Sequence, residues 1–283
     1  MLPGQPSQTL LRSAIRRATH QVLDRPVIFD DPIALQVVPE AAYPTVVASL
    51  AADGSPDPVL LRSLFAMRSR FAEDRLAEAV ARGSRQYVML GVGLDTFAWR
   101  QPDFARAIQL FSVDHPASLA FTQQLLRERG LSQPGNLAFV PADLEGDNVA
   151  SRLRECGFDA TLPSFCSMLG VMQYLTLPAI DALMTFVSSL APGSEIVFSF
   201  ALPEAELTGY DLQALKMSMR FTNGLGEPWQ TRLRPRDWVA KLQSLKFREI
   251  FHLTPALAQQ RYFSNRSDNL RAPGWEQLIA AIV

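Results

Sequence analysis

With 283 residues, of which 48% are hydrophobic, the chain is long enough to bury a substantial core as one large α/β domain. Its formal net charge of −1 creates no long-range field of one sign, so we expect no nucleic-acid partner. The two cysteines lack C-x-x-C spacing and the three histidines are scattered, which argues against a disulfide framework and against a metal site. No apolar run approaches the roughly 20 residues that span a bilayer, and the arginines near the N-terminus precede no apolar core of a secretory signal. We therefore expect a cytoplasmic protein without a membrane partner, and its oligomeric state is left open.

Helices are expected first along the chain, and alternating strands and helices after them. Residues 10–23 are helix-like, Asp31 and Pro32 form a helix start, 53–58 form a loop, and a long helix at 59–82 is ended by Gly83. The alternating part comprises expected strands at 87–91, 108–113, 137–140, 164–169 and 194–200 and helices at 116–129 and 178–191. After an interruption at 203–229, a helix is expected at 235–245 and strands at 247–253 and 261–264.

This order predicts an α/β fold with a doubly wound, mostly parallel sheet behind a helical cap. We expect a single domain, 1–283. Its parts are a helical N-terminal cap at 1–83, a cofactor-binding half at 84–202, a lid insertion at 203–229, and a C-terminal helix and strands at 230–283.

A glycine turn follows the first expected strand. Residues 87–90 form an apolar run without alternation, which is typical of a central parallel strand covered on both faces. Gly91 and Gly93 remove two side chains where this strand ends, so a nucleotide-like ligand can lie against the main chain. A G-x-G turn alone is a weak signal, because many tight turns use it structurally.

Two carboxylates at the ends of the next strands strengthen the prediction. Asp114 ends the second strand 21 residues after Gly93, the spacing at which an acid can accept hydrogen bonds from ribose hydroxyls. It could instead cap the helix that starts at Pro116. Asp143 follows the third strand, where it could take the amine of an adenine while Leu144 packs on the ring, or it could simply form a turn.

An arginine on the apolar stripe of the long helix is the third feature. Arg68 lies on the same face as Leu64 and Phe71, so it needs an anionic partner, because unpaired burial of its charge would be costly. That partner could be a protein carboxylate or the carboxylate of an amino-acid-bearing cofactor. Arg75 lies almost as centrally on the stripe, and periodicity cannot separate the two.

An adenine, a ribose and an α-carboxylate together describe S-adenosylmethionine. The segment 91–100 (GVGLDTFAWR) resembles the cofactor loop of the leucine carboxyl methyltransferase family, which includes bacterial members related to polyketide O-methyltransferases. Motifs of that family are resembled in the same order by 30–32 (DDP), 68–71 (RSRF), 113–116 (VDHP), 143–144 (DL), 169–175 (LGVMQYL), 226–229 (GEPW) and 261–263 (RYF). The resemblance covers about residues 10 to 275.

The resemblance implies a class I methyltransferase fold, with a seven-stranded sheet whose last strand is antiparallel. It implies that Arg68 pairs with the cofactor carboxylate, Gly91 and Gly93 line the methionine moiety, Asp114 holds the ribose, and residues 143–144 hold the adenine. The same motifs make Asp95, His115 and Leu169 candidate cofactor residues. Asp95 belongs to the 91–100 loop, His115 to the VDHP segment and Leu169 to the LGVMQYL segment.

One position departs from the family pattern. Leucine carboxyl methyltransferases proper have an acid before the glycine of the fourth-strand motif, and this chain has Leu169 there. The chain is therefore more similar to the bacterial small-molecule branch. We expect O-methylation of a small-molecule carboxylate or hydroxyl in secondary metabolism.

Candidate catalytic residues depend on which acceptor is used. A carboxylate is ionised at neutral pH and needs no base, whereas a hydroxyl would need one, most plausibly a histidine. His115 could serve or could cap a helix, and His20 could serve if the first helix folds over the cleft. Tyr174, near the exit of the fourth strand, is the best candidate for an acceptor contact, or it is a half-buried core tyrosine.

Acceptor specificity is expected to come from the cap and the 203–229 insertion. Tyr210 and Met217 are candidate acceptor contacts there, and Arg220 could hold an anionic acceptor.

Two other functions fit the same residues. A nicotinamide-dependent oxidoreductase also has G-x-G and a later acid, although Asp95 would meet the pyrophosphate. A protein of this fold could also bind S-adenosylmethionine without transferring its methyl group.

Overall fold

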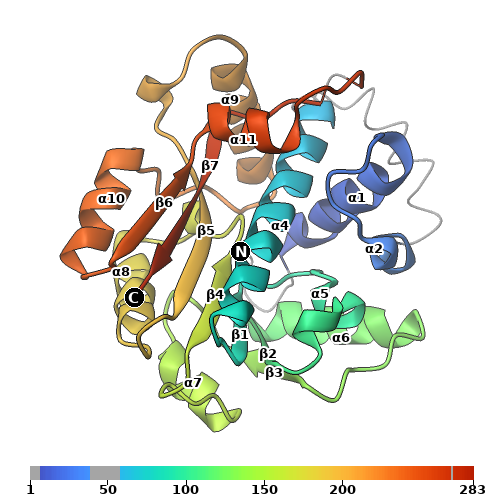
Figure 1. The fold of residues 1–283 in the computed structure, drawn as a ribbon. Coiled ribbons are helices and arrows are strands. Elements are labelled where there is room, and N and C mark those ends of the chain that lie inside the picture. The colour runs from blue at the N-terminus through green and yellow to red at the C-terminus, as the bar shows by residue number, and fades with distance from the viewer. Residues whose placement is uncertain (1–6, 39–57, 269) are drawn as a thin grey trace.

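The computed structural model describes residues 7–38, 58–268 and 270–283. Within these residues seven strands form one sheet in the order β3-β2-β1-β4-β5-β7-β6 (Figure 1). The strands are β1 Gln86–Leu90, β2 Gln109–Asp114, β3 Leu137–Pro141, β4 Ser164–Met168, β5 Glu195–Ala201, β6 Glu249–Leu253 and β7 Glu276–Ile282. The first five pair in parallel, and β7 is antiparallel to both β5 and β6. The predicted mostly parallel, doubly wound sheet is confirmed.

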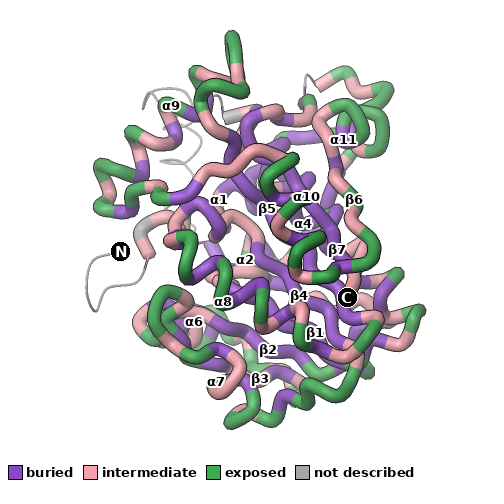
Figure 2. Tube along the Cα trace, turned by 90° about the vertical axis from the view of Figure 1, so that its left-hand side faces the viewer, coloured by how far each residue is buried: buried purple, intermediate pink, exposed green. Residues whose placement is uncertain are grey.

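The centre of the sheet is apolar on both faces, as the unbroken hydrophobic runs predict. Every residue of β1, β4 and β5 is buried, and their traces form the buried centre in Figure 2. Strand β6 is at the edge of the sheet and alternates between exposed and less exposed positions. The difference follows from layering, since helices cover both faces of the central strands.

Each face of the sheet has its own layer of helices. One face is covered by α4 (Pro58–Ala81), α5 (Phe97–Arg100), η1 (Asp103–Ala105), α9 (Gly209–Gly224) and α11 (Pro255–Tyr262). The opposite face is covered by α7 (Val149–Glu155), α8 (Leu177–Ser188) and α10 (Pro235–Ser244). Two short 3-10 helices, η2 (Met172–Tyr174) and η3 (Glu204–Glu206), follow β4 and β5. No described helix is long and apolar enough to cross a membrane.

The helical cap consists of α1 (Gln8–Leu23) and α2 (Pro32–Val37), which pack together and against α6 (Pro116–Glu128). Asp31 caps α2 as predicted, because its Oδ1 accepts a hydrogen bond of 3.0 Å from the Ala34 N–H. A buried charged cluster ties the cap to α4: Asp24 accepts hydrogen bonds from His20 Nδ1 at 2.9 Å and from Arg62 Nε at 2.9 Å. The cap therefore has a polar attachment as well as an apolar one.

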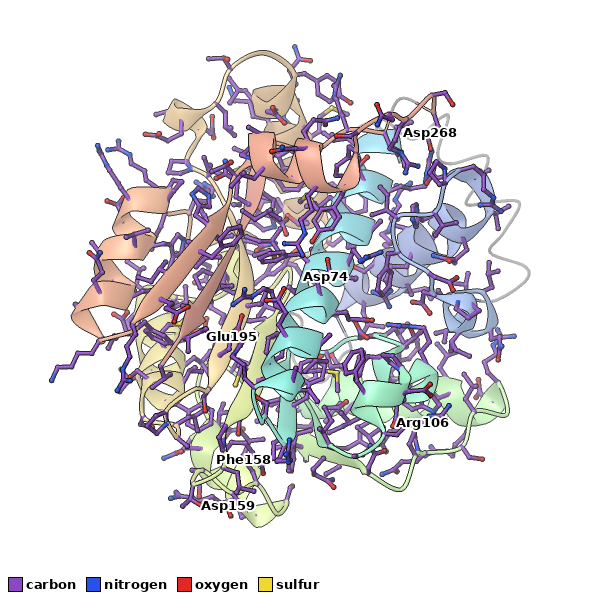
Figure 3. The ribbon with its side chains drawn as sticks, viewed as in Figure 1. Asp74, Arg106, Phe158, Asp159, Glu195 and Asp268 are labelled. Atoms are coloured by element: carbon purple, nitrogen blue, oxygen red, sulfur yellow. The ribbon has the colours of Figure 1, made fainter. Side chains whose placement is uncertain are left out.

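The long helix is also attached to the central sheet by charge. Glu195 begins β5 and lies beside α4 (Figure 3), where it accepts a 2.5 Å hydrogen bond from Arg75 Nε and pairs with Arg82. Burial raises the pKa of this carboxyl, and the two arginines oppose that effect. Arg75 is therefore a structural residue. Helical periodicity alone could not distinguish its role from that of Arg68.

The expected last strand at 261–264 is wrong. Thr254 caps α11 and Pro255 occupies its first turn, so 255–262 is helical, and the last strand is β7 at 276–282. That strand contains two alanines and a polar start, a weaker strand signal than the aromatic residues before it. The expected loop at 53–58 lies, apart from Pro58, outside the described residues. We keep the division at 83, 202 and 229 as a proposal.

Candidate cofactor and acceptor site

A cleft of about 350 Å³ opens at the carboxyl ends of the parallel strands. Ligands bind at this edge in open α/β sheets, because loops from both halves of the sheet diverge there. Its lining includes all the predicted cofactor residues: Arg68, Gly91, Gly93, Asp95, Asp114, His115, Asp143, Leu144 and Leu169. Residues spread over 102 positions of the sequence are thus brought to one cavity by the sheet.

The glycine turn and Asp114 are held together by hydrogen bonds. Asp114 Oδ2 accepts from the Gly93 N–H at 2.7 Å, and Oδ1 accepts from the His115 N–H at 2.7 Å. Gly93 has φ +55°, a conformation that side-chain-bearing residues seldom adopt. Burial raises the pKa of Asp114, and the two backbone N–H groups oppose that rise. The expected alternative, in which Asp114 caps α6, is wrong, because the N-cap is His115.

Arg68 projects from α4 to the junction of the cleft with a second cavity. Its side chain is buried and stacks on Phe65 at 4.0 Å from the ring centre. Its one carboxylate contact among the described residues is a long 3.5 Å bond from Nη1 to Glu276 Oε1. Gly170 leaves room for this guanidinium, since a Cβ there would come within 2.4 Å of Nη1. Burial lowers the pKa of Arg68, and Glu276 opposes that effect.

The remaining predicted cofactor residues have different local roles. Asp143 is exposed and forms a turn through a 3.0 Å bond to the Glu145 N–H, so the turn role and the cleft position coexist. Leu144 packs against the core beside it. Asp95 Oδ1 accepts a 2.8 Å bond from the N–H of Phe97, the first residue of α5. Leu169 packs on the α4 side of the sheet.

Of the three candidate catalytic residues, His20 lies away from the cleft, so its predicted role as a base is wrong. Its ring is buried, Nδ1 bonds to Asp24, and Nε2 accepts from the Ile28 N–H at 3.1 Å. It lines neither cavity, so the structure gives it a role in holding the cap. His115 lines the cleft and caps α6, its Nδ1 accepting from Ala117 N–H at 3.2 Å.

Tyr174 lines both the cleft and the second cavity. Burial raises the pKa of Tyr174 to about 12, so its hydroxyl is protonated at neutral pH. A protonated phenol can donate or accept a hydrogen bond but cannot remove a proton as a phenolate would. Tyr174 is therefore suited to contact an acceptor rather than to act as a base.

The predicted acceptor residues of the insertion lie outside both cavities. Arg220 and Tyr210 are exposed, and Arg271 stacks over the Tyr210 ring at 4.7 Å. Met217 is half-buried and lines neither cavity. The face of α9 that does line the second cavity consists of Ser218, Phe221 and Thr222. The contribution of the insertion to acceptor specificity stays a prediction, and the residues of α9 that line the cavity differ from the three that were expected.

Helix α1 of the cap contributes residues to the cleft that were not among the predicted site residues. Its residues Thr9, Ser13 and Arg17 line the cleft, and Arg17 Nη2 donates to the Leu94 carbonyl of the glycine turn. Both Arg16 and Arg17 of this helix are buried. The signal was present as an arginine pair within a helix that is otherwise rich in alanine and leucine, as for Arg68 on α4.

The described residues contain no group of three His, Cys, Asp or Glu side chains placed to hold a metal ion. The cleft does fit the parts of S-adenosylmethionine. Arg68 makes one long contact, so it retains N–H donors for the carboxylate, and Asp114 retains lone pairs for ribose hydroxyls. Leu144 and Asp143 supply an apolar surface and an acceptor at the third strand. We propose these residues as the cofactor contacts.

Comparisons with known proteins agree with this arrangement. Residues 10–188 match the family model described as leucine carboxyl methyltransferase. The chain is 31% identical over 293 residues to YktD of Bacillus subtilis (strain 168), which is named as a candidate S-adenosyl-L-methionine-dependent methyltransferase, with 96% of each chain covered. A similarly named protein of Mycolicibacterium paratuberculosis (strain ATCC BAA-968 / K-10) is 31% identical, with 96% of this chain and 82% of that protein covered.

Solved structures support the fold. The crystal structure of a candidate methyltransferase from Thermobifida fusca YX superimposes with a TM-score of 0.60 at 20% identity, covering 99% of this chain and 96% of that one. A DUF574 family protein from Streptomyces avermitilis gives a TM-score of 0.58 at 17% identity, covering 94% and 96%. Together with the strand order, this confirms the class I methyltransferase fold.

Proposed function

The chain belongs to the leucine carboxyl methyltransferase family and uses S-adenosylmethionine, and from this premise we propose that it methylates an oxygen of a small-molecule carboxylate or acidic hydroxyl. The methyltransferase assignment sets aside the nicotinamide-dependent oxidoreductase considered above. We include in the proposal a place in secondary metabolism and a location in the cytoplasm.

The observation that carries the proposal is the state of the titratable groups around the cleft. Among the described lining residues, His115 uses Nδ1 as a helix cap, and the raised pKa keeps Tyr174 protonated. His20 is turned into the cap instead. An acceptor that is already ionised at neutral pH needs no proton removed, and carboxylates, with pKa near 4, meet that condition.

When bound, S-adenosylmethionine would supply an electrophilic methyl carbon: the acceptor oxygen would bond to it in line while the C–S bond breaks and the thioether S-adenosylhomocysteine leaves. The protein's task is then to bind and align, a contribution of up to roughly 7–11 kcal/mol in well-oriented systems. Arg68 holds the carboxylate end and Asp114 the ribose, while Gly93 lets the backbone approach. Tyr174 lies where the acceptor enters and orients it by a hydrogen bond.

A binding protein of this fold without methyl transfer is the second candidate. The cofactor contacts would be the same in both cases, so binding alone does not separate them. Formation of a methyl ester or methyl ether does, when the protein is given S-adenosylmethionine and a panel of carboxylic acids and phenols.

The test of mechanism is a pH–rate profile of kcat with the acceptor so identified. We expect the rate to rise with the acceptor's own pKa, near 4 for a carboxylic acid, and then to stay level. His115→Asn keeps a helix-capping side chain and should lose less than tenfold in kcat. A basic limb near 6.5 in the wild type, together with a loss above a hundredfold in His115→Asn with cofactor affinity intact, would establish a histidine base instead.

A further inference from the structure

A second cavity of about 110 Å³ adjoins the cleft and is called the inner chamber below. It shares Arg68, Gly170 and Tyr174 with the cleft, so a molecule in it would be next to the place where the methyl group is transferred. Its walls come from α1, α4, α9 and the segments after β4 and before β7. None of the predicted acceptor residues of the insertion lines it.

The chamber carries an excess of positive charge. Arg12, Arg16 and Arg68 line it, against a single lining carboxylate, Glu276. Arg16 and Arg68 are buried, and the Glu276 contact with Arg68 is long at 3.5 Å. Buried guanidinium groups favour anions, since their charge is weakly screened there. The charge therefore points to an anionic ligand.

Three buried polar side chains that line the chamber have an atom without a hydrogen-bond partner among the described residues. They are Oε1 of Gln173, Oγ of Ser218 and Nε1 of Trp275. These side chains belong to residues that are 3%, 7% and 2% exposed. Buried polar groups are nearly always satisfied, so the grouping of these atoms around one cavity indicates a polar ligand that satisfies them.

Aromatic side chains form the rest of the wall. Trp229 and Trp275 stack with ring centres 5.9 Å apart, and Phe65 and Phe221 line the chamber with Arg68 and Arg12 above their rings at 4.0 and 4.3 Å. Such walls bury an apolar or aromatic body. An engineered cavity of about 150 Å³ binds benzene, so this chamber, opening into the cleft, suits a ligand of at most a single ring.

We propose that the inner chamber binds the methyl acceptor, and that the acceptor is a compact carboxylic acid whose apolar body is no larger than one ring. The proposal rests on the proposed function, because it names the substrate class for the same methyl transfer. Arg16, Ser218 and Trp275 hold the carboxylate, and Phe65 and Phe221 enclose the body.

The test is calorimetric binding of benzoate in the presence of saturating S-adenosylhomocysteine. Benzamide serves as the neutral analogue and 2-naphthoate as the two-ring analogue, and both should bind at least tenfold more weakly than benzoate. Ser218→Leu fills the chamber and Arg16→Gln removes a charge, and each should weaken benzoate at least tenfold. Neither should change the Kd of S-adenosylhomocysteine by more than twofold. Arg220→Gln, an exposed arginine on the same helix as Ser218, should leave the benzoate Kd within twofold.

The proposal is overturned if wild-type protein does not bind benzoate, if benzamide binds equally well, or if Ser218→Leu binds benzoate normally. Should Arg16→Gln unfold, Ser218→Leu decides the matter by itself. Failure of the proposed function is distinguishable. If wild type and Ser218→Leu methylate carboxylic acids equally, the proposed function is supported and the inner chamber is rejected as the acceptor site. If benzoate binding depends on Ser218 but no acid is methylated, the chamber is supported as a carboxylate site and the proposed function is rejected.

Discussion

Arg68 and Arg75 share one stripe of α4, yet their side chains meet different surroundings. Arg75 donates to Glu195 and Glu78 at 2.5 and 2.9 Å, so its charge is compensated within the protein. Among the described residues Arg68 has one carboxylate contact, at 3.5 Å, and it lines two cavities. The same residue type at the same face of one helix thus pairs with protein carboxylates in one case and, as we propose, is available to a ligand in the other.

The contrast gives a matched pair of variants. Arg68→Ala should weaken S-adenosylhomocysteine at least tenfold, because truncating one partner of a buried charge pair costs about 2–5 kcal/mol. Arg75→Ala should leave this affinity within twofold and should instead lower the Tm, since Glu195 then stays buried beside fewer cations. Calorimetry and thermal unfolding measured on both variants separate the two effects. Equal affinity in wild type and Arg68→Ala would show that the cofactor carboxylate is bound elsewhere.

Single residues were predictable from the sequence where a motif fixes the backbone. Gly93 and Asp114 meet because a parallel strand pair brings their two strand ends together, and spacing along the chain reports that geometry. The environment of His20 and the register of Arg220 depend on packing between distant helices. A helical pattern shows which residues share a face, but it does not show which neighbour that face meets.

At the scale of the element, α1 contributes residues that the sequence did not identify individually. They line both the cleft and the inner chamber, whereas the sequence indicated only that the cap should help to set acceptor specificity. Helix starts were easier to predict, because a signature such as Asp31–Pro32 acts locally. The last strand of the sheet was harder to predict, because Arg261–Phe263 contains aromatic residues that favour a strand, whereas the actual strand β7 contains alanines.

The attachment of α1 to α4 can be tested at Asp24. Burial alone would raise the pKa of Asp24, but hydrogen bonds from His20 and Arg62 hold it below its usual value. Asp24→Asn should therefore destabilise the protein at neutral pH by about 3–5 kcal/mol, because Arg62 loses its buried partner. Because the pKa of Asp24 is lower in the folded protein than the ordinary value of about 3.9, its ionised carboxylate stabilises the fold fully at pH values above 3.9. This stabilisation is lost as the pH falls through the folded pKa.

The measurement is urea unfolding of wild type and Asp24→Asn from pH 7 to pH 3. The gap between the two proteins should be constant at neutral pH and should shrink at the acid end. Asp103→Asn removes an exposed carboxylate that pairs with Arg106, labelled in Figure 3, and should match wild type throughout. A gap for Asp24→Asn that persists unchanged to pH 3 would contradict the role of the ionised carboxylate.

At the scale of the whole molecule, the cofactor cleft depends on both ends of the described chain. Arg68 and Glu276 are 208 positions apart, and they meet because β7 is inserted between β5 and β6. The order of strands and the family resemblance were enough to predict a sheet of this kind. They did not predict which residue of the last strand reaches Arg68 and the inner chamber, because that strand itself was misplaced.

Glu276→Gln tests this long-range connection. Without bound ligand the variant should have a lower Tm, since Arg68 is left buried without a carboxylate, a loss of up to about 3–5 kcal/mol. S-adenosylhomocysteine should then raise the Tm by more than in wild type, because the ligand carboxylate supplies the missing anion. Glu249→Gln, on the exposed part of β6, should show the wild-type shift. Identical ligand-induced shifts in all three proteins would rule out a ligand carboxylate at Arg68.

The insertion of β7 also has a consequence for biosynthesis. Strand β6 is translated before β7, yet β7 is its partner in the sheet, and β7 also covers the edge of β5. A nascent chain that has not reached residue 276 therefore presents an open edge on β5, a template for pairing with other chains. It also lacks the carboxylate that Arg68 meets in the finished fold. Pairing of β7 with β5 and β6 and completion of the proposed ligand site are thus one event in folding, because the same strand closes the edge and supplies Glu276.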